Sequence, residues 1–184
     1  MIFGKRIRLR GVEREDLPLF VQWLNDPLVI EGLLYLAPLS LEDEIRWFEK
    51  LADHPPSERP LAIEIQDGDT WRMIGNCSFH NISSTNHSAE VGIFIGDRTV
   101  WNTGYGTEAM QLLVRHGFES LNLNRIMLVV YDDNARAIRA YEKAGFVLEG
   151  RMRQARYRHG KYGDEFIMSI LRSEWDAAQR KMEE

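Results

Sequence analysis

The chain has 184 residues, 44% of them hydrophobic and 28% charged, a composition typical of one soluble globular domain with a sizeable core. Its formal net charge of −5 argues against nucleic acid as a partner and favours a cationic substrate. Because the sequence shows no signal segment and no bilayer-spanning apolar run, and its single cysteine, Cys77, has no disulfide partner, we expect a cytoplasmic protein that binds no membrane.

The N-terminal segment predicts a strand followed by two amphipathic helices. Residues 5–10 alternate apolar and basic side chains, which is the pattern of a half-exposed strand. Residues 13–25 carry apolar side chains at helical spacing and end at an Asn-Asp-Pro stop. Ser40 caps the second helix, with Asp43 in the capping-box position three residues later.

An apolar loop, residues 28–39, separates these helices and is too broken by glycine and proline to form a long helix. Two interpretations of Leu33, Leu34 and Tyr35 stay open. They cover core, or they line the pocket of an acceptor molecule, since functional side chains often lie on loops.

A β-hairpin is predicted next, from residues 61–66 and 71–81, joined by an Asp-Gly-Asp turn. Cys77 lies in its second strand. It is either a nucleophile or a small hydrophobic side chain of the core, which is the usual role of a buried cysteine. After a turn rich in Ser and Asn, residues 89–95 predict the central strand, which is apolar apart from Glu90.

The central strand leads into Gly104 and Gly106, and a helix with an apolar face begins at about Thr107. Such a turn can hold phosphate, because glycines let the backbone approach and the first N–H groups of a helix have no partner within it. The same pattern also occurs as a simple tight turn. A P-loop is excluded because no lysine follows Gly106, whereas a dinucleotide fingerprint is only weakened, since antiparallel-looking strands precede the motif.

The second half of the chain predicts a parallel crossover. Residues 125–131 form the strand that follows this helix, and ligands bind at the carboxyl ends of such strands. Asn134 caps the next helix and Gly145 closes it. Two further strands, about 146–157 and 164–171, and a short C-terminal helix complete the chain.

Three segments carry a family signature: WNTGYGTEA (101–109), NARAIRAYEKAGF (134–146) and KYGDE (161–165). They resemble the GNAT superfamily of acyl-CoA-dependent N-acetyltransferases, in the branch of the ribosomal-protein N-terminal and polyamine acetyltransferases. The resemblance implies a single α/β (α+β) domain over residues 1–184, with a mixed, mostly antiparallel sheet of about seven strands, flanking helices and a central splayed parallel strand pair. Members usually carry Gln or Arg where this chain has Trp101, which leaves the phosphate contacts to backbone amides.

Glu90 and Tyr141 are the candidate catalytic residues. Burial among apolar neighbours should raise the pKa of Glu90 towards that of a useful base, although a Glu on the solvent face of an edge strand fits equally. Tyr141 shares a helical face with Asn134 and Ile138, which suits either a core tyrosine or a phenol presented to a ligand. By resemblance, Glu90 is the base that deprotonates an amine and Tyr141 the acid that protonates a departing thiolate.

The resemblance also implies acetyl-CoA as the acyl donor. Free backbone N–H groups near Phe94 and Ile95, where the parallel strands splay, would pair with the pantetheine arm and polarise the thioester carbonyl. A basic run between positions 136 and 158 either meets the 3′-phosphate or forms a solvated face. The histidines show no metal-ligand spacing, so no metal is expected. The predicted donor-binding residues are Ile93, Phe94, Ile95, Trp101, Asn102, Thr103, Gly104, Tyr105, Gly106, Thr107, Asn134 and Arg139.

We therefore predict direct transfer of acetyl from acetyl-CoA to a primary amine, without a covalent enzyme intermediate. The branch resemblance ranks a protein or peptide N-terminus first as the acceptor, and a polyamine or other small cationic amine second. A non-catalytic acyl-CoA-binding module, which would have no use for Glu90 and Tyr141, is the alternative. The apolar loop is compatible with a homodimer.

Overall fold

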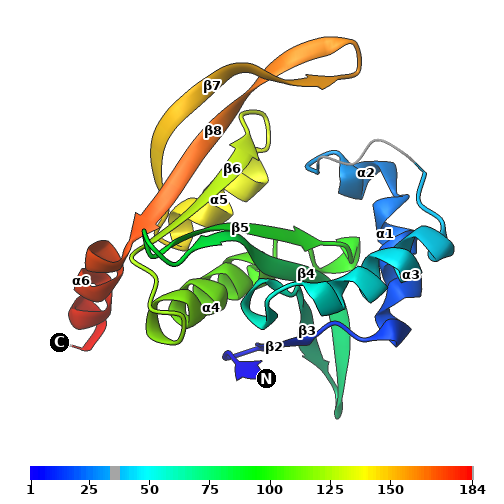
Figure 1. The fold of residues 1–184 in the computed structure, drawn as a ribbon, viewed down its shortest axis with the longest axis horizontal. Coiled ribbons are helices and arrows are strands. Elements are labelled where there is room, and N and C mark those ends of the chain that lie inside the picture. Colours follow the sequence, from blue (N-terminus) through cyan, green and yellow to red (C-terminus); the bar gives the residue numbers. More distant parts are fainter. Residues whose placement is uncertain (34–37, 184) are drawn as a thin grey trace.

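The fold is built on one eight-stranded sheet with strands in the order β1-β2-β3-β4-β5-β6-β8-β7 (Figure 1). The computed structural model describes residues 1–33 and 38–183. Neighbouring strands are antiparallel except β5 and β6, which are parallel. The strands are β1 (Ile2–Phe3), β2 (Ile7–Gly11), β3 (Leu61–Asp67), β4 (Thr70–Ser83), β5 (Ser88–Ile95), β6 (Arg125–Tyr131), β7 (Val147–Arg158) and β8 (Lys161–Leu171).

Helices flank this sheet, with α1, α2 and α3 gathered on one side of the molecule and α6 on the opposite side (Figure 1). The α-helices are α1 (Leu17–Leu24), α2 (Pro27–Ile30), α3 (Leu41–Lys50), α4 (Tyr105–Glu119), α5 (Ala135–Lys143) and α6 (Arg172–Glu183). Short 3-10 turns are η1 (Arg14–Asp16), η2 (Leu51–Asp53), η3 (Pro56–Glu58) and η4 (Arg98–Val100).

The apolar face of α4 forms the centre of the main core. Met110, Leu113, Val114 and Phe118 are each at most 1% exposed and pack with buried side chains of the sheet. Their spacing of three and four residues places them on one face of the helix, so burying them fixes its orientation on the sheet. A second cluster, which contains Phe20, packs α1 against residues of β3 and β4.

The parallel strands β5 and β6 pair only at their beginnings, and this positions the site. Their pairing ends at Glu90, opposite Met127. β5 continues to Ile95 on the edge of β4, and β6 continues to Tyr131 on the edge of β8. The facing backbone edges are therefore open to a ligand at the carboxyl ends of the strands, as the predicted splayed pair requires.

Most predicted elements are confirmed, including the β3–β4 hairpin and the parallel crossover from β5 through α4 to β6. Ser40 and Asp43 form the predicted capping box at the start of α3. Asn134 caps α5 by accepting a hydrogen bond from the N–H of Ala137 at 3.1 Å. The sheet has eight strands rather than about seven, because Ile2–Phe3 pairs with β2.

Several boundaries differ from the prediction for local reasons. α4 begins at Tyr105, two residues earlier than expected, because Gly104 (φ 91°) is its N-cap. β8 begins at Lys161, three residues earlier than expected, because the chain reverses at His159 and Gly160, which both have positive φ.

The N-terminal helices also show such differences. The predicted helix over residues 13–25 begins as the 3-10 turn η1 and becomes α-helical at Leu17. Part of the predicted loop is helical, because Asp26 caps α2 by accepting from the N–H of Leu28 at 2.9 Å. Leu34 and Tyr35 lie outside the described residues. Over the described residues, no helix is long and apolar enough to cross a membrane, and no cluster of metal-ligating side chains is present.

Candidate active site

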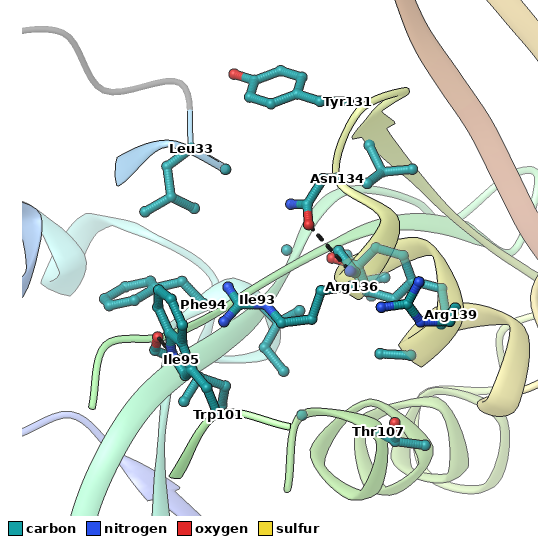
Figure 2. Close-up of a pocket in the computed structure, with 18 of the residues that line it drawn as sticks. Leu33, Ile93, Phe94, Ile95, Trp101, Thr107, Tyr131, Asn134, Arg136 and Arg139 are labelled. Atoms are coloured by element: carbon teal, nitrogen blue, oxygen red, sulfur yellow. Dashed lines mark hydrogen bonds between the residues drawn. The ribbon is translucent and has the colours of Figure 1, made fainter. Parts of the chain in front are cut away.

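A pocket of about 740 Å³ opens at the splay between β5 and β6 and extends to the start of α4, the face of α5 and the loop after α2 (Figure 2). It brings together nearly all the side chains and glycines that the sequence analysis selected. The predicted residues in its wall are Glu90, Ile93, Phe94, Ile95, Trp101, Asn102, Gly104, Tyr105, Gly106, Thr107, Asn134, Arg139 and Tyr141.

Thr103 is the exception, because it does not line the pocket. Its hydroxyl donates to the carbonyl of Val100, and its own carbonyl accepts from Nη1 of Arg6 at 3.2 Å. Thr103 therefore has a role within the turn, and its contact with the donor stays a prediction. Thr103 shapes the loop that leads to α4.

The glycine turn forms an anion site by leaving the start of α4 uncapped. Gly104 is the N-cap and has no side chain, so it satisfies none of the free N–H groups of the first turn. These groups, at the positive end of a 15-residue helix, point towards the pocket region that Gly104, Tyr105 and Gly106 line. The arrangement suits a phosphate group.

The two glycines serve different purposes. Gly104 needs its left-handed backbone, which side-chain-bearing residues adopt only with strain. A Cβ on Gly106, by contrast, would lie 3.6 Å from Cγ1 of Ile95, an ordinary contact. Protein packing therefore does not require glycine at 106, and the space beside its backbone remains for a ligand.

Arg6 and Glu108 hold the turn in place, although the sequence pattern gave no sign of this. Nε of Arg6 donates to Oε2 of Glu108 at 2.8 Å, and the backbone N–H groups of Lys5 and Arg6 donate to Oε1. The Arg6 guanidinium also lies over the ring of Tyr105, 4.5 Å from its centroid. Because Arg6 and Glu108 are 102 residues apart in the chain, no local motif could predict the contact.

Cationic side chains of α5 line the wall opposite the glycine turn. Arg136 reaches from α5 towards Trp101, with its guanidinium carbon 3.5 Å from the centroid of the indole ring (Figure 2). Burial lowers the pKa of Arg136. Arg136, Arg139 and Lys143 all line the pocket, and none of them forms an ion pair within the described residues. Their charge is available to an anionic ligand.

A hydrogen bond to the end of β5 fixes the indole ring of Trp101. Its indole Nε1 donates to the carbonyl of Ile95 at 2.8 Å. The ring is thereby held at the end of β5, where it supports Arg136 without neutralising it.

The loop after α2 closes on the start of α5. A Cβ on Gly32 would lie only 2.8 Å from Nδ2 of Asn134, so this glycine permits a close approach of loop and helix. Arg158 of β7 donates to the carbonyls of Glu31 and Leu33, and Arg98 pairs with Asp26 at 3.0 Å. The segment from Asp26 to Leu33 is thus bound at both ends. Leu33 packs against the second core cluster and also lines the pocket, so for this residue both interpretations hold.

Tyr141 lies in the pocket wall on α5. Its ring packs against Phe146, with 6.1 Å between centroids, and it is partly buried against the main core. Burial raises the pKa of Tyr141 to about 12. The phenol therefore keeps its proton at physiological pH, as a proton donor must.

Glu90 lies at the point where β5 and β6 separate. Its side chain is half-buried, intermediate between the enclosed and the solvent-facing positions that the sequence left open, and Nδ2 of Asn81 donates to its Oε2 at 3.2 Å. His80 lies opposite it on β4 and shares the pocket wall. The position suits contact with an incoming amine, either direct or through water.

Cys77 lies in the core and not in the pocket wall. It is fully buried, and burial raises the pKa of its thiol to about 12. Because the thiolate is the nucleophilic form, this cysteine does not support a covalent acyl-enzyme step.

The comparisons with known proteins agree with this geometry. The family model described as the acetyltransferase (GNAT) domain matches residues 6–147. The chain belongs to the GNAT acetyltransferases. As a member, it is an acyltransferase that uses acetyl-CoA as its acyl donor.

Three relatives illustrate the family. The chain is 31% identical to the uncharacterized N-acetyltransferase p20 of Bacillus licheniformis, over 95% of this chain and 97% of the relative. It is 32% identical to YdaF of Bacillus subtilis, provisionally named a ribosomal N-acetyltransferase, over 71% of this chain and 67% of the relative. The crystal structure of spermidine N-acetyltransferase from Vibrio cholerae in complex with CoA and spermine matches with a TM-score of 0.84 at 26% identity, over 94% of this chain and 99% of that one.

Proposed function

We propose that this GNAT enzyme acetylates a primary amine of a small, multiply charged acceptor such as a polyamine. The observation that carries the proposal is one pocket that joins an anion-binding glycine turn to two carboxylates, Glu90 and Glu165. The cationic end suits the phosphates of CoA, and the carboxylates suit ammonium groups. The Vibrio cholerae neighbour, solved with spermine, supports this acceptor class.

A peptide N-terminus is the second candidate, although the sequence alone ranked it first. YdaF supports it through its provisional name. We place the small cationic amine first because the spermidine acetyltransferase matches nearly the whole chain and because the pocket contains buried negative charge. A homodimer and the cytoplasmic location stay predictions.

The proposed mechanism uses Glu90 and Tyr141 as a base and an acid. Glu90, directly or through water, accepts a proton from the acceptor ammonium, which is charged at pH 7 because a primary alkylamine has a pKa of about 10.4. The amine nitrogen then attacks the thioester carbonyl, and N–H groups on the open edge of β5 stabilise the oxyanion. The carbon–sulfur bond breaks, and the Tyr141 phenol protonates the CoA thiolate. The nitrogen gives up its second proton to form the neutral amide, and this proton restores the Tyr141 phenol.

Thiol release from acetyl-CoA, measured against a panel of acceptors, tests the proposal. The panel holds spermidine, spermine, peptides with varied N-termini, free amino acids and aminoglycosides. We expect turnover with the polyamines at a kcat/KM at least tenfold above that with peptides. Turnover with peptides alone would favour a peptide N-terminus over a polyamine as the acceptor. CoA binding without any turnover would favour a non-catalytic acyl-CoA-binding module.

A further inference from the structure

Glu165 is a buried carboxylate in the wall of the active-site pocket. It lies on β8 and is only 8% exposed. The sheet register places it directly opposite Tyr131 of β6, so the two side chains lie on the same face, and both line the pocket. Tyr131 is at the far rim from Thr107 (Figure 2).

Within the described residues, the Glu165 carboxylate forms no ion pair and accepts no hydrogen bond. Three arginines of the β7–β8 hairpin are engaged with other partners. Arg151 pairs with Asp132 and Asp164, and Arg156 pairs with Asp133. Arg158 donates to backbone carbonyls of the loop after α2. None of these three arginines pairs with Glu165.

A buried carboxylate without a partner is costly to a folded protein. Buried polar groups of this kind call for an explanation, and one that faces an open pocket can be satisfied by a ligand cation. The acetyl donor cannot supply that cation, because CoA is anionic and its phosphates fit the opposite wall. The cation must come from the acceptor.

The reacting nitrogen lies elsewhere. Acetyl transfer takes place at the splay of β5 and β6, and β6 separates β5 from Glu165. Across the sheet, two strand spacings amount to roughly 10 Å. Along the sheet, Tyr131, opposite Glu165, lies four residues or roughly 13 Å beyond Met127, opposite Glu90, so the two backbones are roughly 16 Å apart. An extended polyamine, towards which both carboxylate side chains reach, suits this separation, so Glu165 suits a second ammonium group of the same acceptor.

We propose that Glu165 is a specificity-determining residue that binds the distal, non-reacting ammonium of a di- or polyamine acceptor. The inference rests on the proposed function and assigns its preference for multiply charged acceptors to one side chain. Tyr131, across the strand pair, provides an apolar ring beside the methylene chain. A single charge-assisted contact of this kind accounts for a preference of roughly ten- to a hundredfold.

The isosteric variant Glu165→Gln tests the inference by steady-state kinetics with spermidine and with butylamine, which has one amine only. We expect KM for spermidine to rise roughly ten- to a hundredfold, with KM for acetyl-CoA unchanged and butylamine kinetics little affected. Glu119→Gln, an exposed carboxylate at the end of α4, makes the same change in net charge and should leave both acceptors unchanged.

Thermal melting separates recognition from a structural role. Removing a buried unpaired charge should leave the Tm of Glu165→Gln equal to or above that of the wild type. An unchanged KM for spermidine, or an equal rise for butylamine, overturns the inference while the proposed function stands. A wild-type enzyme that neither binds nor acetylates spermidine overturns both.

Discussion

The guanidinium of Arg136 lies over the indole ring of Trp101, 3.5 Å from its centroid, and joins α5 to the segment before the glycine turn. GNAT members usually place Gln or Arg at the position of Trp101. Here the cation comes from another element and rests on an aromatic face, which holds it without cancelling its charge. The stack therefore presents a positive charge beside the uncapped start of α4.

Arg136→Gln should weaken CoA binding by roughly tenfold or more, because a charge-assisted contact to phosphate is lost. Isothermal titration with CoA and with S-acetylpantetheine, which lacks the diphosphate, measures the effect. Affinity for the pantetheine fragment should stay unchanged. Arg153→Gln, on an exposed arginine of β7 that forms no ion pair with the described residues, is the matched control. Equal losses in the two variants would assign the effect to net charge alone.

Alanine at Gly104 and at Gly106 should have opposite consequences. Gly104→Ala places a side chain at φ 91° and should lower the free energy of unfolding by about 1–2 kcal/mol. Gly106→Ala should leave stability unchanged or slightly higher, since its Cβ meets only an ordinary contact in a helix, yet reduce CoA affinity at least tenfold. Urea denaturation and titration with CoA check both. Full CoA affinity in Gly106→Ala would contradict the anion site.

Tyr141→Phe should lower kcat by roughly a hundredfold or more while CoA affinity stays within a factor of two, because only the proton donor is removed. Since the pKa of Tyr141 is raised to about 12, the wild-type rate should show no loss through ionisation of this phenol below pH 10. Stopped assays from pH 6 to 10 and CoA titrations provide the data. Normal turnover by the variant across this range would show that Tyr141 is not the acid.

Glu44→Gln should stabilise the protein at alkaline pH. Burial raises the pKa of this α3 carboxyl from its ordinary value of 4.5 to about 7, so the folded state favours the protonated form. The wild-type free energy of unfolding should therefore fall by about 3 kcal/mol as pH rises from about 4.5 to 7, and it should stay at the lower value above pH 7. Unfolding free energies should coincide for wild type and variant at pH 4 and differ at pH 8. Glu42→Gln, exposed on the same helix, should show no such divergence.

The amino-acid sequence by itself determined the features that depend on neighbouring residues. The apolar spacing of α4, the Gly104 turn, the Asn134 cap and the crossover between β5 and β6 all follow from short-range periodicity and backbone geometry. The family resemblance carried by these segments implied the fold class, and thirteen of the fourteen predicted site residues line the pocket, together with others that the sequence did not single out. Two of the boundaries that differed, at Tyr105 and Lys161, follow residues with positive φ, namely Gly104 and the pair His159 and Gly160.

Only the tertiary structure decided which distant side chains meet. Arg6 with Glu108, Arg136 with Trp101 and the close approach of Gly32 to Asn134 join segments that share no local pattern. The tertiary structure also decided how deeply the two pocket carboxylates, Glu90 and Glu165, are buried. Glu90 is half-buried because the β5–β6 pairing ends beside it, and Glu165 is buried because β8 lies inside the sheet, between β6 and β7. Charge pairing and exposure depend on how the sheet closes around a residue, and a linear pattern does not contain that information.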